Sequence, residues 1–170
     1  MQHTAPLIVT LALDEHSFLY FNALRQQYFP PAINYLAAHL TLFHHLPANE
    51  PAVFDDLETW CRAYAPFSLQ VTGVRSIGKG VAFTIESPTL LALHKTMQVK
   101  WQQWLKPQDK QKLWPHITVQ NKVSPQVAKE TLQTLQASFQ PFAPKALGFQ
   151  LWTYLGGPWE AIKSYPFQKP

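Results

Sequence analysis

A four-residue pattern occurs twice in this chain and restricts the folds that its 170 residues can adopt. His39–Leu42 reads HLTL, and His116–Val119 reads HITV, 77 positions later. Each copy leads into a helix that begins at a proline, and then into a hairpin that contains glycine. Ile77-Gly78 in the first hairpin corresponds to Leu155-Gly156 in the second, at an offset of 78. The near-constant offset predicts two similar lobes.

The hydrophobic pattern predicts strands that alternate with helices. Strands are expected over 6–13, 40–46 and 116–123, and hairpins over 69–86 and 147–165. Helices are expected to begin near 14–17, 51, 87 and 124, where capping residues or prolines precede apolar stripes. Residues 106–112 read as a polar loop. This order predicts an α+β fold with mostly antiparallel sheets. The length suits one domain over residues 1–170, made of two pseudo-symmetric lobes with a cleft between them.

The repeated motif places its polar residues on one face of a strand, because residues i and i+2 point to the same side. His39 and Thr41 therefore face one way, and the leucines that alternate with them face the other. His116 and Thr118 repeat this arrangement with an isoleucine and a valine. In both strands the apolar side can pack on a core. If the lobes are related by a pseudo-twofold axis, the two His-Thr faces meet across the cleft.

Two histidines and two threonines in one cleft suit phosphodiester chemistry. Since a free imidazole has a pKa near 6.5, one ring can accept a proton from an attacking hydroxyl or water while the other donates one to the leaving oxygen. Threonine hydroxyls can hydrogen-bond the non-bridging phosphate oxygens. This chemistry requires no metal and no cofactor, and we expect neither. The alternative is a purely structural repeat in which the histidines are buried and hydrogen-bonded.

A metal site is not favoured by the remaining residues. His44 and His45 follow His39 closely, but neighbouring strand residues face opposite sides, so both cannot join it. His45 shares the alternation of His39 and Thr41 and is expected to line the edge of the cleft. The single cysteine, Cys61, excludes a Cys-based zinc site, and the sequence has no dense carboxylate cluster.

Charge and hydropathy indicate the setting in which the chain acts. A net charge of +4 and a pI near 9.2 suit a phosphate-bearing partner, although many proteins without one share this bias. The sequence contains no run of 18 apolar residues, so no membrane span is expected. Residues 6–13 read as a strand and not as a signal peptide. We therefore expect a cytoplasmic monomer with no membrane and no protein partner.

The two His-x-Thr segments, their spacing and the order of elements resemble the 2H phosphoesterase superfamily, also called the 2′-5′ RNA ligase family, over nearly the whole chain. The resemblance implies a bilobal α+β fold and metal-independent cleavage, or in reverse ligation, of 2′-linked or 2′,3′-cyclic phosphodiesters of RNA ends or small nucleotides. It implies that His39 and His116 are the acid/base pair and that Thr41 and Thr118 bind phosphate. Which histidine is the acid stays open. The alternative is a module of the same fold that binds an RNA end or nucleotide without turnover.

The chain departs from this resemblance at one position. Many relatives have an arginine just after the second motif, where this chain has Gln120-Asn121-Lys122. Lys122 shares the alternation of His116, so it is either a phosphate-binding cation or a solvated lysine at a strand end. A lysine does not replace the bidentate fork of an arginine.

Other candidate contacts have ordinary structural alternatives. Arg25, on the first predicted helix, either reaches a phosphate or lies on a solvated helix face. Tyr154, like Trp152 and Trp159 in the last hairpin, either stacks on a base or packs within the sheet. The lysines of the polar loop, Lys106, Lys110 and Lys112, either steer an anionic substrate or are ordinary linker residues.

Overall fold

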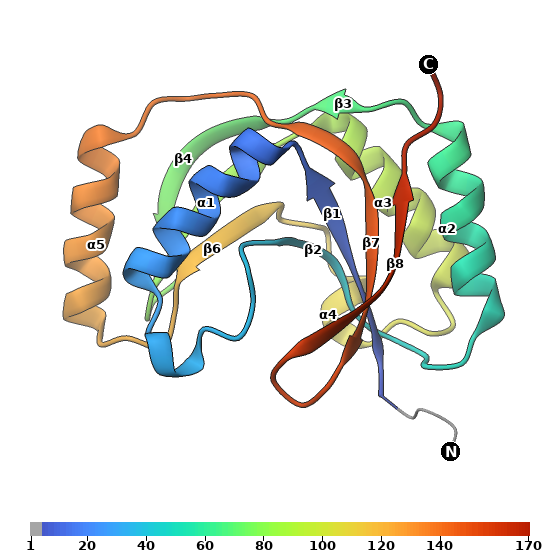
Figure 1. Ribbon diagram of the computed structural model, residues 1–170, viewed down its shortest axis with the longest axis horizontal. Coiled ribbons are helices and arrows are strands. Elements are labelled where there is room, and N and C mark those ends of the chain that lie inside the picture. Colours follow the sequence, from blue (N-terminus) through green and yellow to red (C-terminus); the bar gives the residue numbers. More distant parts are fainter. Residues whose placement is uncertain (1–4) are drawn as a thin grey trace.

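Two antiparallel sheets, joined by helices that cross between them, form the protein (Figure 1). The computed structural model describes residues 5–170. The larger sheet has the order β2-β1-β7-β3, with β8 also paired to β7, and the smaller sheet has the order β4-β5-β6. All strand pairs are antiparallel. The predicted bilobal α+β class is confirmed.

The elements follow the order that the sequence predicts, with a few additions. The strands are β1 (Leu7–Leu13), β2 (Leu40–Leu46), β3 (Phe67–Ser68), β4 (Gln70–Ser76), β5 (Val81–Glu86), β6 (His116–Gln120), β7 (Lys145–Tyr154) and β8 (Trp159–Pro166). The helices are α1 (Glu15–Tyr28), α2 (Pro51–Ala63), α3 (Pro88–Trp101), α4 (Pro107–Lys110) and α5 (Pro125–Ser138), with a 3-10 turn η1 (Pro31–Ile33).

Local sequence explains where these helices begin. The side chain of Asp14 accepts a hydrogen bond from the amide of Ser17 at the start of α1. Ser87 and Ser124 cap α3 and α5 in the same way, and each is followed by a proline at the first helical position. Such caps satisfy amides that the helix itself leaves unpaired, and proline has no amide to satisfy.

The two halves of the chain exchange a helix. Helix α1 follows β1 of the larger sheet, yet it packs against β6 of the smaller sheet. Helix α3 follows β5 of the smaller sheet, yet His94 in α3 stacks on Phe43 of β2 at a centroid distance of 4.6 Å. The order β2-β1-β7 in one sheet therefore corresponds to β6-β5-β4 in the other. Because of this correspondence, the two strands that carry the repeated motif occupy equivalent edges.

Three local features differ from the sequence expectations. Residues 106–112 contain the short helix α4 and a buried residue, Asp109, and are not simply a polar loop. The strand expected over 116–123 ends at Gln120. The two-residue strand β3 was not expected, because it forms by pairing with Ala146 and Lys145 of β7, which are distant from it in the sequence. In residues 5–170, no helix has the length and apolar character needed to cross a membrane.

Candidate active site

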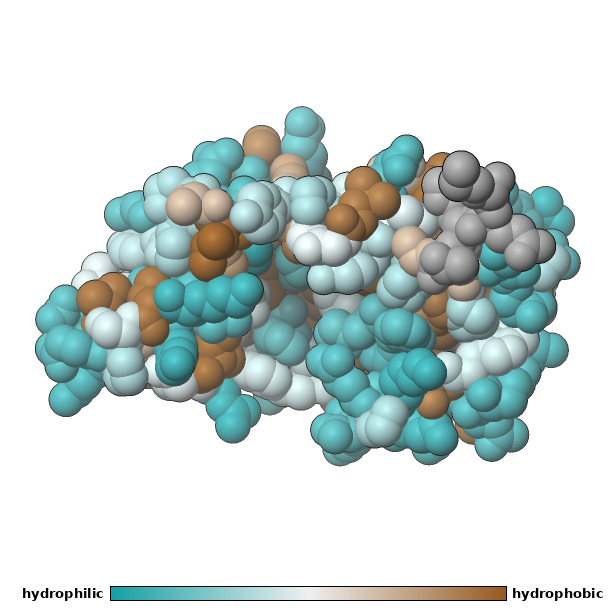
Figure 2. All heavy atoms as spheres, turned by 90° about the horizontal axis from the view of Figure 1, so that it is seen from below, coloured by the Kyte–Doolittle hydropathy of each residue, from teal (hydrophilic) through white to brown (hydrophobic). Residues whose placement is uncertain are grey.

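The two motif strands, β2 and β6, lie next to each other at the junction of the sheets. The space-filling view shows a hollow between the two lobes (Figure 2). Along β2, Leu40 and Leu42 are buried, whereas His39 and Thr41 are partly exposed. In β6, Ile117 and Val119 are fully buried, while His116 and Thr118 keep some exposure. The predicted division into an apolar core side and a polar side is therefore confirmed.

Both histidines are held by the same local hydrogen bond. Nδ1 of His39 lies 2.8 Å from the carbonyl oxygen of Ala37, and Nδ1 of His116 lies 2.7 Å from that of Trp114. In each case the acceptor is the carbonyl two residues earlier. A carbonyl can only accept, so Nδ1 carries the hydrogen in both rings. Nε2 of each imidazole is left without a protein partner among the described residues and is the nitrogen available to a substrate.

A tryptophan packs on each ring and fixes its plane. Trp114 is stacked on His116, with centroids 4.1 Å apart and ring planes 12° apart. The guanidinium of Arg75 lies 4.9 Å from the centroid of the Trp114 ring, which completes a three-layer stack. Trp159 lies 4.7 Å from His39 at an interplanar angle of 53°. Trp159 also lies 6.0 Å from Trp152 of β7, so it packs both within the sheet and on a motif histidine, and its stacking on a base stays a prediction.

Burial lowers the pKa of both imidazoles and so favours their neutral forms. It lowers the pKa of His39 to about 4, with the backbone hydrogen bond opposing and the charges of Arg25, His116 and His44 adding to the decrease. Burial also lowers the pKa of His116, again opposed by its backbone hydrogen bond and reinforced by the charge of His44. The charge of His44 thus acts on both motif rings, and the charges of Arg25 and His116 act on His39.

Arg25 contradicts one of its two sequence alternatives, a solvated helix face, and its contact with a phosphate stays a prediction. The residue is only 5% exposed, so it does not lie on a solvated helix face. Nη1 donates to the carbonyl oxygen of Thr118 at 3.0 Å, and Nε donates to Oδ1 of Asn34 at 2.9 Å. Its guanidinium also lies 4.0 Å from the ring centroid of Phe29. Burial lowers the pKa of Arg25 to about 10, which still leaves it charged at neutral pH. Arg25 ties α1 to the free edge of β6.

The alternation that assigned His45 to the cleft is interrupted by β-bulges. Phe43 of β2 pairs with Val9 of β1, and Thr41 pairs with Thr10, so β2 advances two residues while β1 advances one. A second shift follows before Leu46. The argument from alternation is therefore wrong for His45, whose role as a substrate contact stays a prediction without this support.

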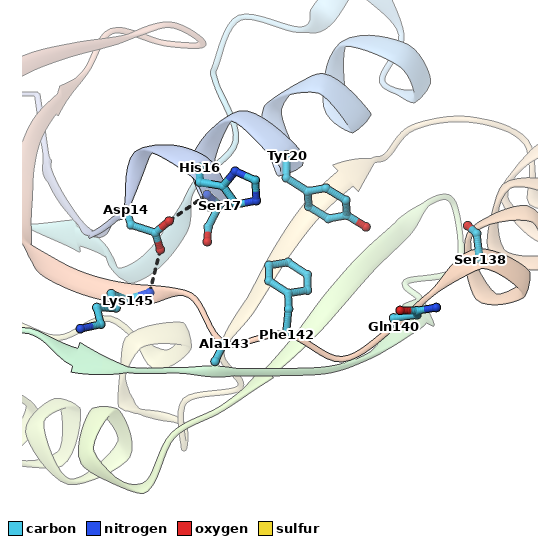
Figure 3. A pocket seen from close by; sticks show the side chains of 9 residues that line it. All are labelled: Asp14, His16, Ser17, Tyr20, Ser138, Gln140, Phe142, Ala143 and Lys145. Atoms are coloured by element: carbon cyan, nitrogen blue, oxygen red, sulfur yellow. Dashed lines mark hydrogen bonds between the residues drawn. The ribbon is translucent and has the colours of Figure 1, made fainter.

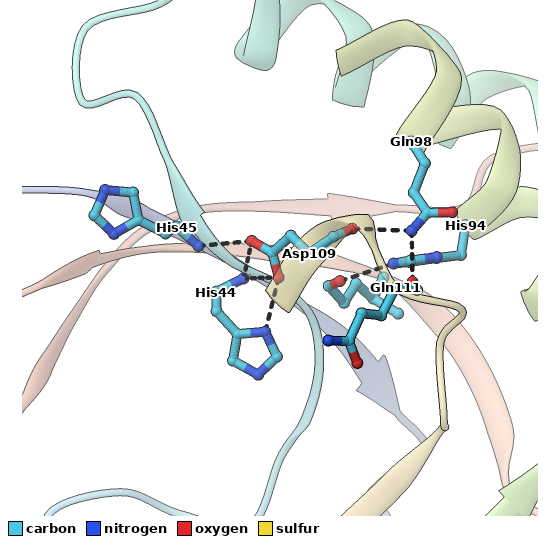
Figure 4. Close-up of polar contacts among 7 residues, drawn as sticks. His44, His45, His94, Gln98, Asp109 and Gln111 are labelled. Carbon is cyan, nitrogen blue, oxygen red and sulfur yellow. Dashed lines mark hydrogen bonds and ion pairs between the residues drawn. The ribbon is translucent and has the colours of Figure 1, made fainter. Parts of the chain in front are cut away.

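His44 is the residue that joins the cleft instead. It lines a cavity of about 210 Å³ together with Thr41 and His116. Nδ1 of His44 lies 2.9 Å from Oδ1 of Asp109, and the backbone amides of His44 and His45 both donate to the same carboxylate. Figure 4 shows the two imidazoles pointing in different directions from this contact. Because Asp109 lies 65 residues away in the sequence, no local pattern could have identified this pair.

Two other predicted contacts lie at or beyond strand ends. Lys122 lies beyond the end of β6, is exposed, and has a positive φ of 61°. Strand β6 ends at Gln120, so the strand alternation does not extend to Lys122. The argument that placed Lys122 in the cleft by alternation is therefore wrong. Tyr154 lies at the end of β7 and is 40% exposed. It shares a strand face with Trp152, whose Nε1 donates to Oγ1 of Thr10. Substrate contacts of Lys122 and Tyr154 stay predictions.

A separate cavity lies away from these histidines. It has a volume of about 710 Å³ and lies between the start of α1 and the segment 138–145 (Figure 3). Tyr20 and Phe142 line it, and the carboxylate of Asp14 bonds the amides of Ser17 and Lys145 at one side. No residue of either repeated motif lines this cavity. Over residues 5–170, no three His, Cys, Asp or Glu side chains are grouped so that they could hold a metal ion.

Several solved structures share this fold. The protein TT0787 of Thermus thermophilus is similar with a TM-score of 0.64 and 15% identity, over 95% of this chain and 97% of that one. A crystallised phosphoesterase is similar with a TM-score of 0.62 and 15% identity, over 98% and 100%. LigT of E. coli, complexed with 3′-AMP, has a TM-score of 0.60 and 16% identity, over 97% and 99%. At these identities the likeness supports the fold alone.

Sequence comparison supplies the family. No curated protein matches the chain. A family model described as the 2′-5′ RNA ligase superfamily matches residues 13–158. This match includes both His-x-Thr motifs, the whole smaller sheet, and strands β2, β3 and β7 of the larger one. The chain therefore belongs to the 2′-5′ RNA ligase superfamily, the 2H phosphoesterases.

Proposed function

We propose that the protein is a metal-independent phosphoesterase that cleaves, or in reverse ligates, 2′-linked or 2′,3′-cyclic phosphodiesters of RNA ends or small nucleotides. The observation that carries the proposal is the matched pair of imidazoles, His39 and His116, each with Nδ1 bonded to the carbonyl two residues earlier. This arrangement leaves two Nε2 atoms for one substrate. General acid–base catalysis requires two such proton carriers, one on each side of the reacting phosphorus.

For hydrolysis of a 2′,3′-cyclic phosphate, the neutral imidazole of one histidine removes a proton from water. The water oxygen forms a bond to phosphorus, and the bond from phosphorus to one ribose oxygen breaks. The second histidine, protonated, gives its proton to that leaving oxygen. The hydroxyls of Thr41 and Thr118 hydrogen-bond the non-bridging oxygens, where negative charge increases. At the end the two histidines have exchanged protonation states, so the same groups can run the reverse reaction.

The pKa values favour one assignment for the hydrolytic direction. The base must be neutral and the acid protonated before the reaction. The imidazole with the lower pKa, His39, is held neutral more firmly, so we propose that it is the base. His116 then is the acid. In the reverse of this step, ring closure with release of water, the roles are exchanged.

The first test replaces each histidine with alanine and measures turnover of 2′,3′-cyclic nucleotides and 2′-5′ dinucleotides. We expect His39→Ala and His116→Ala each to reduce the rate by about 10²–10⁴-fold, the usual contribution of one proton transfer. His16→Ala is the matched control, since His16 is an exposed histidine on α1. EDTA should not change the rate. Circular dichroism checks that each variant is folded.

The outcomes separate the proposal from its rivals. Full activity in either motif variant would end the two-histidine mechanism. Loss of activity in EDTA, with recovery on adding zinc, would favour a metal mechanism. Tight binding of these nucleotides without any product, while both histidines are intact, would favour the non-catalytic binding module.

A further inference from the structure

The cleft continues past Thr41 and His116 into a second polar region. The 210 Å³ cavity described above is lined on its far side by residues outside the repeated motifs. These side chains come from β2, α3, α4 and the segment between α4 and β6. Their polar members are His44, His94, Gln108, Asp109, Gln111 and Lys112, of which His94 is bonded through Nε2 to the carbonyl oxygen of Leu42. The region lies directly beside the proposed reaction centre, but the mechanism above does not use it.

The orientation of His44 in this cavity is fixed by a buried carboxylate. The Asp109 side chain is 2% exposed, whereas that of His44 is 40% exposed. Burial raises the pKa of Asp109, but the hydrogen bonds from the His44 ring and from the amides of His44 and His45 outweigh it and lower the pKa overall. The ionised carboxylate only accepts hydrogen bonds, so Nδ1 of His44 donates to it. Nε2 of His44 remains for a ligand.

The carboxylate itself is occupied and held in place. Its contacts are with β2, through the ring of His44 and the amides of His44 and His45 (Figure 4). The backbone around Asp109 is anchored to α3, because Nε2 of Gln98 donates to the carbonyl oxygens of Asp109 and Gln111 at 2.9 and 2.7 Å. His44 is therefore presented by a rigid support.

The other charged groups in this part of the molecule are lysines. Lys112 lines both this cavity and an adjoining one of about 340 Å³, which also contains Lys95 and Lys110. None of these three lysines forms an ion pair in the described part of the chain. Asp109 is the one carboxylate among the described residues that line the two cavities. Unpaired cations around a polar cavity favour an anionic ligand.

We propose that this cavity is a second phosphate site, in which Nε2 of His44 and the ammonium of Lys112 bind another phosphate group of the same substrate. Since Nδ1 of His44 already donates to Asp109, the neutral ring accepts at Nε2 from a hydroxyl of a phosphate monoanion, and the protonated ring donates there to a phosphate oxygen. The proposal rests on the function proposed above and narrows it. The preferred substrate is a nucleotide that carries a phosphate besides the one between His39 and His116.

Calorimetry with two nucleotides tests this site without requiring turnover. Adenosine 3′,5′-bisphosphate should bind the wild-type protein about tenfold more tightly than 3′-AMP, because the second phosphate gains charge-assisted hydrogen bonds. Lys112→Gln and His44→Gln should each bring the ratio of the two affinities toward one. Lys129→Gln removes the same charge from an exposed position on α5 and should keep the ratio.

A dinucleotide with a 3′-phosphate identifies the source of the second phosphate. If this dinucleotide binds more tightly than 3′-AMP, as the bisphosphate is expected to do, internucleotide phosphates enter the cavity and the substrate is an RNA end. If only the bisphosphate gains, the substrate is a small nucleotide. Equal affinities for 3′-AMP and the bisphosphate in the wild type overturn the second site, as does a ratio that persists in both variants.

Turnover of 2′,3′-cyclic AMP, measured in parallel, separates this inference from the proposed function. Cleavage without any preference for the bisphosphate rejects the second site and keeps the reaction. A preference that depends on Lys112, with no cleavage of any nucleotide, rejects the reaction and keeps the site. If neither nucleotide binds, both proposals fall.

Discussion

The orientation of each motif histidine depends on very local features. The bond from Nδ1 to the carbonyl two residues earlier is made within the same segment, at Ala37 for His39 and at Trp114 for His116. A ring held in this way keeps one tautomer, and packing by a tryptophan restricts its rotation. The same enclosure that orders the rings also removes water, and this lowers both pKa values.

The pH dependence of kcat/KM follows from these lowered values. The base, His39, must be neutral, so the rate rises as the pH increases through its pKa of about 4. The acid, His116, must be protonated, so the rate falls as the pH increases through its own pKa, which lies below the ordinary 6.5. We therefore expect a bell-shaped profile for 2′,3′-cyclic AMP with a maximum on the acidic side of 6.5. An optimum above about pH 7 would contradict the lowered pKa values of the pair.

At the level of elements, strand irregularities decide which residues face the cleft. The bulges in β2 bring His44 to the cavity and leave backbone amides that the ladder with β1 does not use. Asp109 of α4 accepts hydrogen bonds from two such amides. In the smaller lobe, Gly80 lies in the turn just before β5. Its Cα is close to the carbonyl group of Gln120 at the end of β6. Close backbone approach there fixes the register of the strand that carries His116.

Gly80→Ala tests the importance of this close approach. A Cβ at position 80 would overlap the backbone of Gln120, so β6 would have to move. We expect a loss of about 1–3 kcal/mol in the free energy of unfolding, as for overpacking elsewhere, together with reduced turnover. Gly73→Ala is the matched control, since a Cβ at that position meets nothing within 4 Å. Urea unfolding of the two variants gives the comparison, and equal stabilities would refute the argument.

On the scale of the whole molecule, the cleft exists because the lobes are interlocked. Helix α1 follows a strand of the larger sheet but packs on the smaller sheet. Helix α3 follows a strand of the smaller sheet but contacts the larger one. Arg25 is the polar link in this exchange, because it donates to the free edge of β6 from α1. Its second bond, to Asn34, connects α1 to the segment that leads into β2.

Arg25→Lys should show how much this link contributes. A lysine cannot reproduce two hydrogen bonds in the fixed geometry of a guanidinium. We expect the free energy of unfolding to fall by about 1–3 kcal/mol, the usual cost of leaving buried polar groups unpaired. Arg62→Lys, at an exposed position of α2, should change it by less than about 0.5 kcal/mol. Chemical denaturation measures both, and similar values for the two variants would argue against a structural role for Arg25.

The amino-acid sequence determined the order of elements, the two-lobed α+β class and the four motif residues. These follow from short-range rules: strand alternation, helix caps, prolines at helix starts and a repeat at constant spacing. The alternation of Thr41 with Leu40 and Leu42 needs no knowledge of distant residues.

Only the tertiary structure decided which other residues join the site. The bulges of β2 removed the alternation argument for His45 and brought His44 to the cavity. The end of β6 at Gln120 removed the argument for Lys122, and the packing of α1 buried Arg25. Asp109 reached His44 across 65 residues of sequence. Each of these outcomes depends on contacts between segments that are far apart in the chain, and periodicity within one segment carries no information about them.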